Sequence, residues 1–273
     1  MNIKKGINES AFPEGLNYKE IFEITKKAGF EGIEMNYFFE TGRLNTKSSN
    51  SYLEEIKGFS ENFNLKIPSL LCAETYRLLP TTSLKEKTRL INLIENAFIV
   101  CKKFGSDTLL ICEGWINENI GYLEGYKNSL KFFKEISKIA EDYKVYIGIE
   151  NVRNKFLLTP LSFLNFIKEI GSKYIRIYFD TGNVIGYGYP DDWIETLKDY
   201  IVQIHIKDFK ERENIFVSIL DGDVDWLRFK KILSKIKYSG FLIVEKSQHP
   251  FFPIEDIYLN SIKLDIILGN FKI

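Results

Sequence analysis

The sequence has only three cysteines and two histidines among its 273 residues, and these shortages exclude several classes of protein. Cys72, Cys101 and Cys112 are odd in number, widely spaced and without a C-x-x-C pair. They therefore predict neither a disulfide framework nor a zinc site built on cysteine. We interpret them as buried fillers of apolar segments, in a protein that is expected to be cytoplasmic and reduced.

An excess of charge of one sign is also lacking. Lysine plus arginine and aspartate plus glutamate both total 37, and no long basic run is present. Proteins built mainly to hold nucleic acid usually carry a basic excess or stripe, so we expect no nucleic-acid partner. The chain also lacks an N-terminal apolar segment of signal-peptide length and any apolar stretch of transmembrane length. We therefore expect no membrane partner.

No Pro/Gly/Ser-rich linker or low-complexity tract divides the chain, so residues 1–273 are expected to form one domain. Short runs of branched apolar residues alternate instead with longer amphipathic segments. The runs that predict strands are residues 3–8, 32–35, 66–71, 107–112, 145–150, 174–180, 201–208 and 241–245. Eight strand–helix units in this length are typical of an α/β protein with a (β/α)8 TIM barrel.

The alternative fold is an open, doubly wound parallel sheet. Such sheets usually carry a G-x-G-x-x-G turn after the first strand, and "ESAFPEGLNY" at that place has no such motif. Helix signals occur in three amphipathic segments: two close on Gly29 and Gly105, and a third begins after the capping residue Asp225 and is predicted to end at Gly240.

Four late strands each carry a polar side chain at or near the carboxyl end. The fifth, sixth and eighth runs end in Glu150, Asp180 and Glu245, and the seventh carries His205 near its end. Taken singly, each has an ordinary explanation, either the start of a loop or a hydrogen-bonded core histidine. Taken together, they lie on the rim where TIM barrels have their active sites.

Each of these residues directly follows large apolar residues, where an unpaired buried charge costs several kcal/mol. Three carboxylates aimed at one place also repel one another. A divalent cation would remove both problems, because it neutralises the carboxylates and provides ligand bonds. Three oxygen donors and one imidazole suit Mn²⁺ best, and Mg²⁺, Co²⁺ or Zn²⁺ would also be compatible.

Five segments carry a resemblance to a known family. They are "IGIENVRNKFLLTP", "YFDTGNV", "IHIKDFK", "DGDVDW" and "GFLIVEK". Together they resemble the xylose isomerase-like sugar isomerase/epimerase superfamily, which includes D-tagatose 3-epimerase, L-ribulose-5-phosphate 3-epimerase and 5-keto-L-gluconate epimerase. The resemblance extends from about Gly148 to Lys246, and the first half follows more loosely through "GFEGIEM".

The resemblance implies that Glu150, Asp180, His205 and Glu245 are the metal ligands, and that Glu150 and Glu245 are also the paired acid and base. Asn183 follows Asp180 by three residues, as in the pentulose-phosphate members. Glu211 stands where the free-sugar epimerases have an arginine, with Arg212 one residue later, which argues against a free ketohexose as the substrate.

The predicted function is therefore a divalent-metal-dependent epimerase or isomerase of a ketose, a keto-sugar acid or a ketose phosphate. One glutamate would remove a proton next to the carbonyl and the other would return one, through an enediolate that the metal stabilises. Candidate substrate-binding residues are Asn183, Lys207, Arg212, Arg77 and Trp115. The cations suit a carboxylate or phosphate, and the tryptophan suits a sugar face. Asp208 is a candidate for orienting His205 or Lys207.

Several alternatives stay open at this point. An aldose–ketose isomerase would use the same metal and one glutamate, and a keto-inositol dehydratase would use a similar rim. An apurinic endonuclease of this fold would need many histidines, whereas only His205 and His249 are present. A catalytically inert sugar-binding barrel would not need two glutamates. The 22 phenylalanines and 15 tyrosines also suggest a homo-oligomer that buries some of them between subunits.

Overall fold

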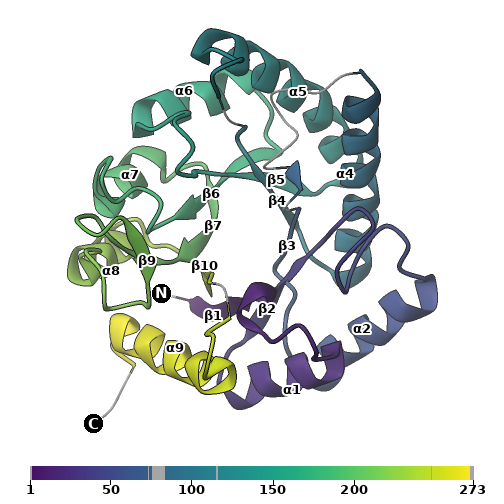
Figure 1. Cartoon of the computed structure of the whole chain (residues 1–273), viewed down its shortest axis with the longest axis vertical. Helices are drawn as coiled ribbons and strands as arrows, with labels where there is room; N and C mark the ends of the chain where they lie inside the picture. Colours follow the sequence, from purple (N-terminus) through teal and green to yellow (C-terminus); the bar gives the residue numbers. More distant parts are fainter. Residues whose placement is uncertain (1, 73, 76–83, 115, 247, 271–273) are drawn as a thin grey trace.

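The computed structural model describes residues 2–72, 74–75, 84–114, 116–246 and 248–270, and it contains a closed barrel of eight parallel strands. The spatial order of the strands is β1-β10-β7-β6-β5-β4-β3-β2, and helices form a ring outside them (Figure 1). The barrel strands are β1 (Ile3–Asn8), β2 (Gly32–Asn36), β3 (Ser69–Leu71), β4 (Thr108–Cys112), β5 (Tyr146–Glu150), β6 (Ile175–Asp180), β7 (Ile201–Ile206) and β10 (Gly240–Val244). The predicted TIM barrel is confirmed.

The helices of the ring follow from ordinary end signals. They are α1 (Tyr18–Lys27), α2 (Asn50–Asn62), α4 (Leu84–Phe104), α5 (Tyr122–Tyr143), α6 (Pro160–Ile170), α7 (Pro190–Leu197), α8 (Trp226–Lys235) and α9 (Pro253–Leu268), and a 3-10 turn, η1 (Glu9–Ala11), follows β1. Gly29 and Gly105 follow α1 and α4 with φ of +82° and +73°, so both predicted helix ends are confirmed. Within the described part of the chain, no helix has the length and apolar character needed to cross a membrane.

The predicted end of the third helix is wrong. Asp225 does cap α8, because its side chain accepts a hydrogen bond from the Arg228 backbone N–H at 2.9 Å. The helix ends at Lys235, however, and Gly240 is the first residue of β10. A glycine stands there for a different reason: the first carbon of any side chain would lie only 2.9 Å from the Tyr238 hydroxyl oxygen.

Side chains of the strands point alternately into the barrel and out toward the helices. On β6, Ile177 and Phe179 pack outward in the main core, whereas Tyr178 points inward. The inward cluster consists of Leu71, Leu110, Tyr178, Phe241 and Ile243. Because alternate residues share a face, Asp180 must point the same way as Tyr178, into the mouth of the barrel.

A short antiparallel hairpin, β8 (Asp208–Lys210) and β9 (Ile215–Val217), follows β7 and is absent from the sequence-based predictions. The predicted seventh strand was extended to residue 208, but β7 ends at Ile206. The apolar run stops at Lys207 and Asp208, and these two charged residues mark the break between β7 and β8. Arg153 fastens the hairpin to the neighbouring loops: its guanidinium lies 3.9 Å from the Phe209 ring centroid and contacts the Asn214 side chain.

Asp208 was expected to orient His205 or Lys207, but it organises the loop after the hairpin instead. Its fully buried carboxylate accepts hydrogen bonds from the backbone N–H groups of Phe209, Gly222 and Val224 and from the indole N–H of Trp226, at 2.9–3.2 Å. A side chain at Gly222 would collide with this carboxylate.

Asp208→Asn is expected to lower the free energy of unfolding by about 2–3 kcal/mol, because an amide cannot accept all four hydrogen bonds and a charged acceptor is lost. Urea denaturation measures the change. Asp223→Asn is the matched control in the same loop: Asp223 is exposed and accepts one backbone hydrogen bond, from Glu211. We expect that control to cost less than about 1 kcal/mol, and equal effects of the two variants would contradict the role given to Asp208.

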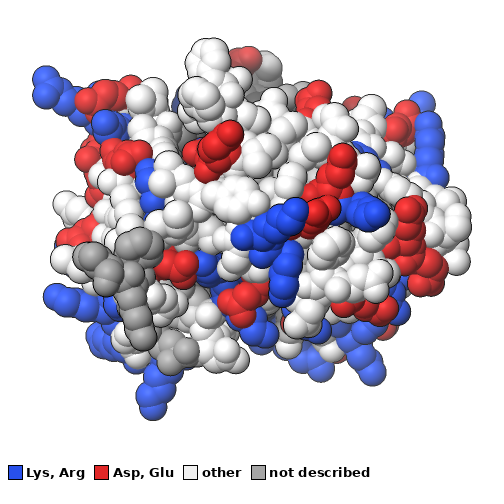
Figure 2. All heavy atoms as spheres, turned by 90° about the horizontal axis from the view of Figure 1, so that it is seen from below, with Lys and Arg blue, Asp and Glu red and all other residues white. Residues whose placement is uncertain are grey.

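The outer surface shows no separation of charge on the face seen in Figure 2. Lysine and arginine side chains are interspersed there with aspartate and glutamate, as the formal net charge of zero leads one to expect.

Candidate metal centre

The four predicted ligands converge at the carboxyl ends of four neighbouring barrel strands. Glu150 and Asp180 are the last residues of β5 and β6. His205 is the last residue but one of β7, and Glu245 directly follows β10. Each of the four offers one possible ligand atom, and these atoms all lie within 4.8 Å of one another.

The imidazole of His205 is the centre of this cluster. Its Nδ1 lies 3.0 Å from Glu150 Oε1, 3.3 Å from Glu245 Oε2 and 4.0 Å from Asp180 Oδ2. The side chains of His205 and Asp180 are fully buried, whereas that of Glu245 is 21% exposed. The cluster is thus closed on the barrel side and open toward Glu245.

Glu34, on β2, accepts a hydrogen bond from the other nitrogen of this imidazole. It is not among the site residues predicted from the sequence. Its Oε1 accepts from His205 Nε2 at 2.6 Å and from Asn8 Nδ2 at 2.8 Å. Its Oε2 accepts from the hydroxyls of Ser69 at 2.7 Å and Tyr178 at 2.5 Å. Since Glu34 accepts at Nε2, the proton belongs on Nε2 and the lone pair on Nδ1 faces the three carboxylates.

The barrel interior is shaped to let Tyr178 reach Glu34. The Tyr178 and His205 rings pack with their centroids 4.4 Å apart. Gly148, on the adjacent strand β5, makes room for this ring, because a side-chain carbon there would lie 3.0 Å from Tyr178 Cδ2. The signal for Glu34 lies in "GIEM", where an acidic residue interrupts an apolar strand and alternation turns it into the barrel.

Asp180 is fixed so that only one of its oxygens faces the cluster. Its Oδ1 accepts from the Asn183 backbone N–H at 2.7 Å. The Asn151 side chain bonds both the N–H and the C=O of Asp180, at 2.9 and 3.0 Å, which ties the ends of β5 and β6 together. Oδ2 of Asp180 is buried and, among the described residues, accepts no hydrogen bond; the same holds for Oε2 of Glu245.

These carboxylate oxygens lie beside the ammonium group of Lys207, which is 3.2 Å from Asp180 Oδ2 and forms an ion pair with Glu245. Two of these three carboxylates keep an oxygen that accepts no hydrogen bond among the described residues, and three carboxylates beside an imidazole nitrogen fit a divalent cation. The donor set and its burial therefore match the predicted metal site.

The charges around the cluster pull the pKa values of the two glutamates apart. Burial, followed by the negative charge of Glu245, raises the pKa of Glu150 to about 7. Burial alone would also raise the pKa of Glu245, but the positive charge of Lys207 is the largest of the effects that outweigh burial and hold this pKa below its usual range. Two neighbouring carboxyls whose pKa values are shifted in opposite directions are candidates for the acid and the base of a reaction.

The predicted substrate-binding residues lie in different places. Lys207 points into the cluster, as described above. Asn183 lies beside it, but its side-chain amide donates to the Asn151 carbonyl oxygen at 2.9 Å. Arg212 is exposed in the turn between β8 and β9, so the structure does not bring it to the cluster. Arg77 and Trp115 lie outside the described residues.

Comparison with known proteins agrees with the fold. Residues 22–264 match the family model of the xylose isomerase-like TIM barrel, so this chain belongs to that family. The resemblance inferred from the sequence motifs is thereby confirmed.

Two curated relatives and one solved structure illustrate the range of the family. The chain is 31% identical to the uncharacterized protein MJ1311 of Methanocaldococcus jannaschii over 56% of its own length and 53% of that protein. It is 26% identical to the putative L-ribulose-5-phosphate 3-epimerase SgbU of Haemophilus influenzae, over 92% of both chains. The crystal structure of the IOLI protein with a bound zinc atom has a TM-score of 0.81 at 18% identity, covering 98% of this chain and 99% of that one.

Proposed function

We propose that this protein is a divalent-metal-dependent epimerase or isomerase of a keto sugar or keto-sugar derivative. The observation that carries the proposal is the convergence of Glu150, Asp180, His205 and Glu245 within 4.8 Å at the barrel mouth. The name of the relative that aligns over 92% of both chains, a putative L-ribulose-5-phosphate 3-epimerase, supports this substrate class.

The proposed reaction begins with the removal of a proton from the carbon next to the substrate carbonyl. One of Glu150 and Glu245 accepts this proton while the electron pair of the broken C–H bond moves toward the carbonyl oxygen. The other glutamate, protonated, returns a proton to the same carbon from the opposite face. The two carboxylates suit this division of work because they come from strands separated by β6 and β7, so that they face a bound substrate from two sides.

The four residues of the cluster would hold the metal, with Mn²⁺ favoured by three carboxylates and one imidazole. A bound divalent ion supplies a Lewis acid that stabilises negative charge developing on the substrate oxygen. Asp180 serves as a ligand only, because its second oxygen is committed to the Asn183 backbone. Glu34 fixes the orientation of the His205 imidazole by accepting a hydrogen bond from its Nε2.

The test is proton exchange with solvent. Protein loaded with Mn²⁺ and incubated in D₂O with a panel of ketoses, keto-sugar acids and ketose phosphates should incorporate deuterium at one carbon of its substrate and form the epimer. Treatment with EDTA should remove both activities, and Mn²⁺ should restore them. Exchange that persists undiminished in metal-free protein would overturn the proposal, and so would loss of water from the substrate without epimer formation.

A further inference from the structure

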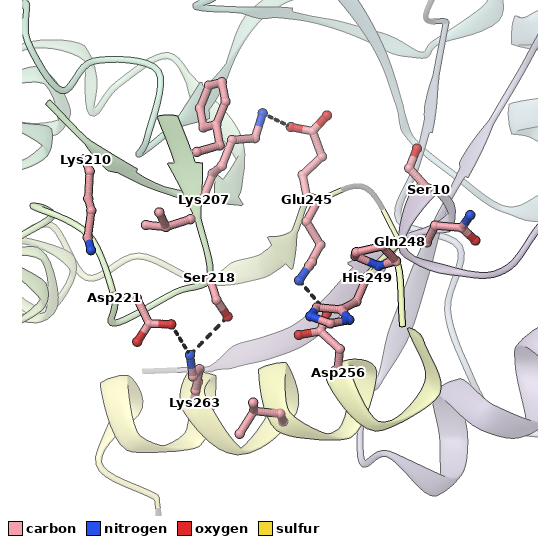
Figure 3. Close-up of a pocket in the computed structure, with 15 residues that line it drawn as sticks. Ser10, Lys207, Lys210, Ser218, Asp221, Glu245, Gln248, His249, Asp256 and Lys263 are labelled. Atoms are coloured by element: carbon pink, nitrogen blue, oxygen red, sulfur yellow. Dashed lines mark hydrogen bonds and ion pairs between the residues drawn. The ribbon is translucent and has the colours of Figure 1, made fainter. Parts of the chain in front are cut away.

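A groove of about 910 Å³ leads away from the metal centre between the loops that follow β7 and β10. Glu245 and Lys207 lie at one end of it, and a cluster made by Ser218, Asp221 and Lys263 lies at the other (Figure 3). The proton transfers proposed above use only the first end. The far end is therefore available to a part of the ligand that does not react.

The far end holds a lysine in a fixed position. Lys263, on α9, donates to Ser218 Oγ and Asp221 Oδ2, both at 3.0 Å, and its side chain is only 13% exposed. An ammonium group has three N–H donors, so one remains available after these two contacts. The Ser218 hydroxyl lies beside it as a further polar group.

Lys210, on β8, adds positive charge to the same groove. Its backbone is paired with Ile215 in the hairpin, which fixes where the side chain starts. Among the residues that the structure describes, its ammonium group has no ion-pair partner. Asp221 and Asp256 also line the groove, but each is already paired with a lysine, Lys263 and Lys246 respectively. Lys210 is therefore the cation of the groove whose charge is not balanced.

We propose that this groove binds the phosphate group of a phosphorylated keto sugar whose reacting carbon lies at Glu245. The inference rests on the proposed function and narrows it to ketose phosphates. Lysines are compact point charges, and several of them can each contact a different oxygen of a phosphate dianion. A carboxylate is matched better by the planar fork of an arginine, and no arginine is found among the described residues that line the groove.

The location agrees with a general property of the fold. In TIM barrels, a phosphate site is frequently formed by the loops after the seventh and eighth strands of the barrel. Here those strands are β7 and β10. Lys210 and Ser218 come from the loop after the first of them, and Lys246 directly follows Glu245, which itself follows the second.

The experiment compares three substrates with the Mn²⁺-loaded protein: a pentulose, its 5-phosphate ester and a keto-sugar acid of similar size. The kcat/KM for the phosphate ester should exceed that for the free pentulose by about 100-fold or more, since several charge-assisted hydrogen bonds are gained. An equal preference for the keto-sugar acid would overturn the assignment to phosphate, as would equal values for the ester and the free sugar.

Two variants locate the site. Lys210→Gln and Lys263→Gln should each lower the ratio of kcat/KM for the ester to kcat/KM for the free pentulose by about 10- to 100-fold. Lys210→Gln is the cleaner variant, because Lys263 also ties α9 to the loop at Ser218. Lys19→Gln is the matched control: this exposed lysine on α1 lies outside the groove and should leave the ratio unchanged.

A binding measurement separates this inference from the proposed function. Inorganic phosphate should bind to EDTA-treated protein in calorimetry, and the double variant Lys210→Gln/Lys263→Gln should abolish that binding. If the wild-type protein exchanges no proton with any ketose but still binds phosphate through these lysines, the proposed function fails and the anion site stands. If phosphate binding is the same in the double variant, the groove is not the phosphate site.

Discussion

Glu150→Gln and Glu245→Gln should each lower the rate of epimerisation by about 10²- to 10⁴-fold or more, because each removes one of the two groups that carry the proton. The effect on deuterium exchange with solvent should differ between the two epimers of the substrate. In each variant the remaining glutamate still removes a proton from one face, so one epimer should exchange deuterium without changing configuration. The two variants should differ in which epimer exchanges, and mass spectrometry of each isolated epimer measures this.

Both glutamates are also proposed metal ligands, so the control must separate loss of metal from loss of the acid or base. Asp180→Asn provides it, because Asp180 belongs to the same cluster but has no proton-transfer role. At saturating Mn²⁺, Asp180→Asn should regain much of its activity, whereas the two glutamine variants should not. Full recovery of Glu150→Gln and Glu245→Gln by added metal would show that they only bind the ion and would contradict the two-glutamate mechanism.

Glu34→Gln should weaken Mn²⁺ binding by about 10- to 100-fold, the usual effect of removing a carboxylate that orients a metal-binding histidine. The carboxylate accepts four hydrogen bonds and holds the proton of His205 on Nε2. Glutamine keeps the size of the side chain, but its amide cannot accept at both ends. Titration of Mn²⁺ followed by electron paramagnetic resonance reports this loss without requiring a substrate.

Glu9→Gln is the matched control for Glu34→Gln. Glu9 is also a buried carboxylate at the mouth of the barrel, and it accepts from Arg43, Tyr18 and the Asn36 backbone rather than from His205. We expect this variant to lower stability while leaving the Mn²⁺ affinity within about twofold, since it touches no proposed ligand. Equal losses of affinity in the two variants would mean that Glu34 acts only through general stability.

Much of the fold was accessible from the sequence because each barrel strand is a short branched apolar run. The eight predicted runs all correspond to barrel strands, with shifts at their ends. Such shifts are expected where hydrogen bonding rather than hydrophobicity decides the boundary. Lys66, predicted as the start of the third strand, contributes only an isolated bridge to Gly32. The β8–β9 hairpin was missed because its strands have only three residues each and the first, Asp208–Lys210, is mostly charged, so neither forms an apolar run long enough to be recognised.

The four proposed metal ligands could be predicted from the sequence for a similar reason. Strand ends in a parallel barrel share one rim, so polar residues there can be grouped without knowing the distances between them. Glu34 was missed because it lies inside a strand near the start of the chain, where alternation rather than position at a strand end decides its direction. Arg212 was included because it stands next to the position where the free-sugar epimerases have an arginine, but the hairpin carries it to an exposed turn.

The carboxylate of Asp208 has a consequence for how the segment that follows it can be redesigned. The carboxylate binds the backbone N–H groups of Phe209 and Val224, and so holds both ends of the segment 209–224, only three positions after the histidine of the metal cluster. Insertions or exchanges within residues 209–224 can therefore change the lining of the groove. The four proposed metal ligands lie on or next to the barrel strands and would keep their positions. Replacing residues 209–224 with the corresponding segment of a relative is therefore expected to change the substrate preference.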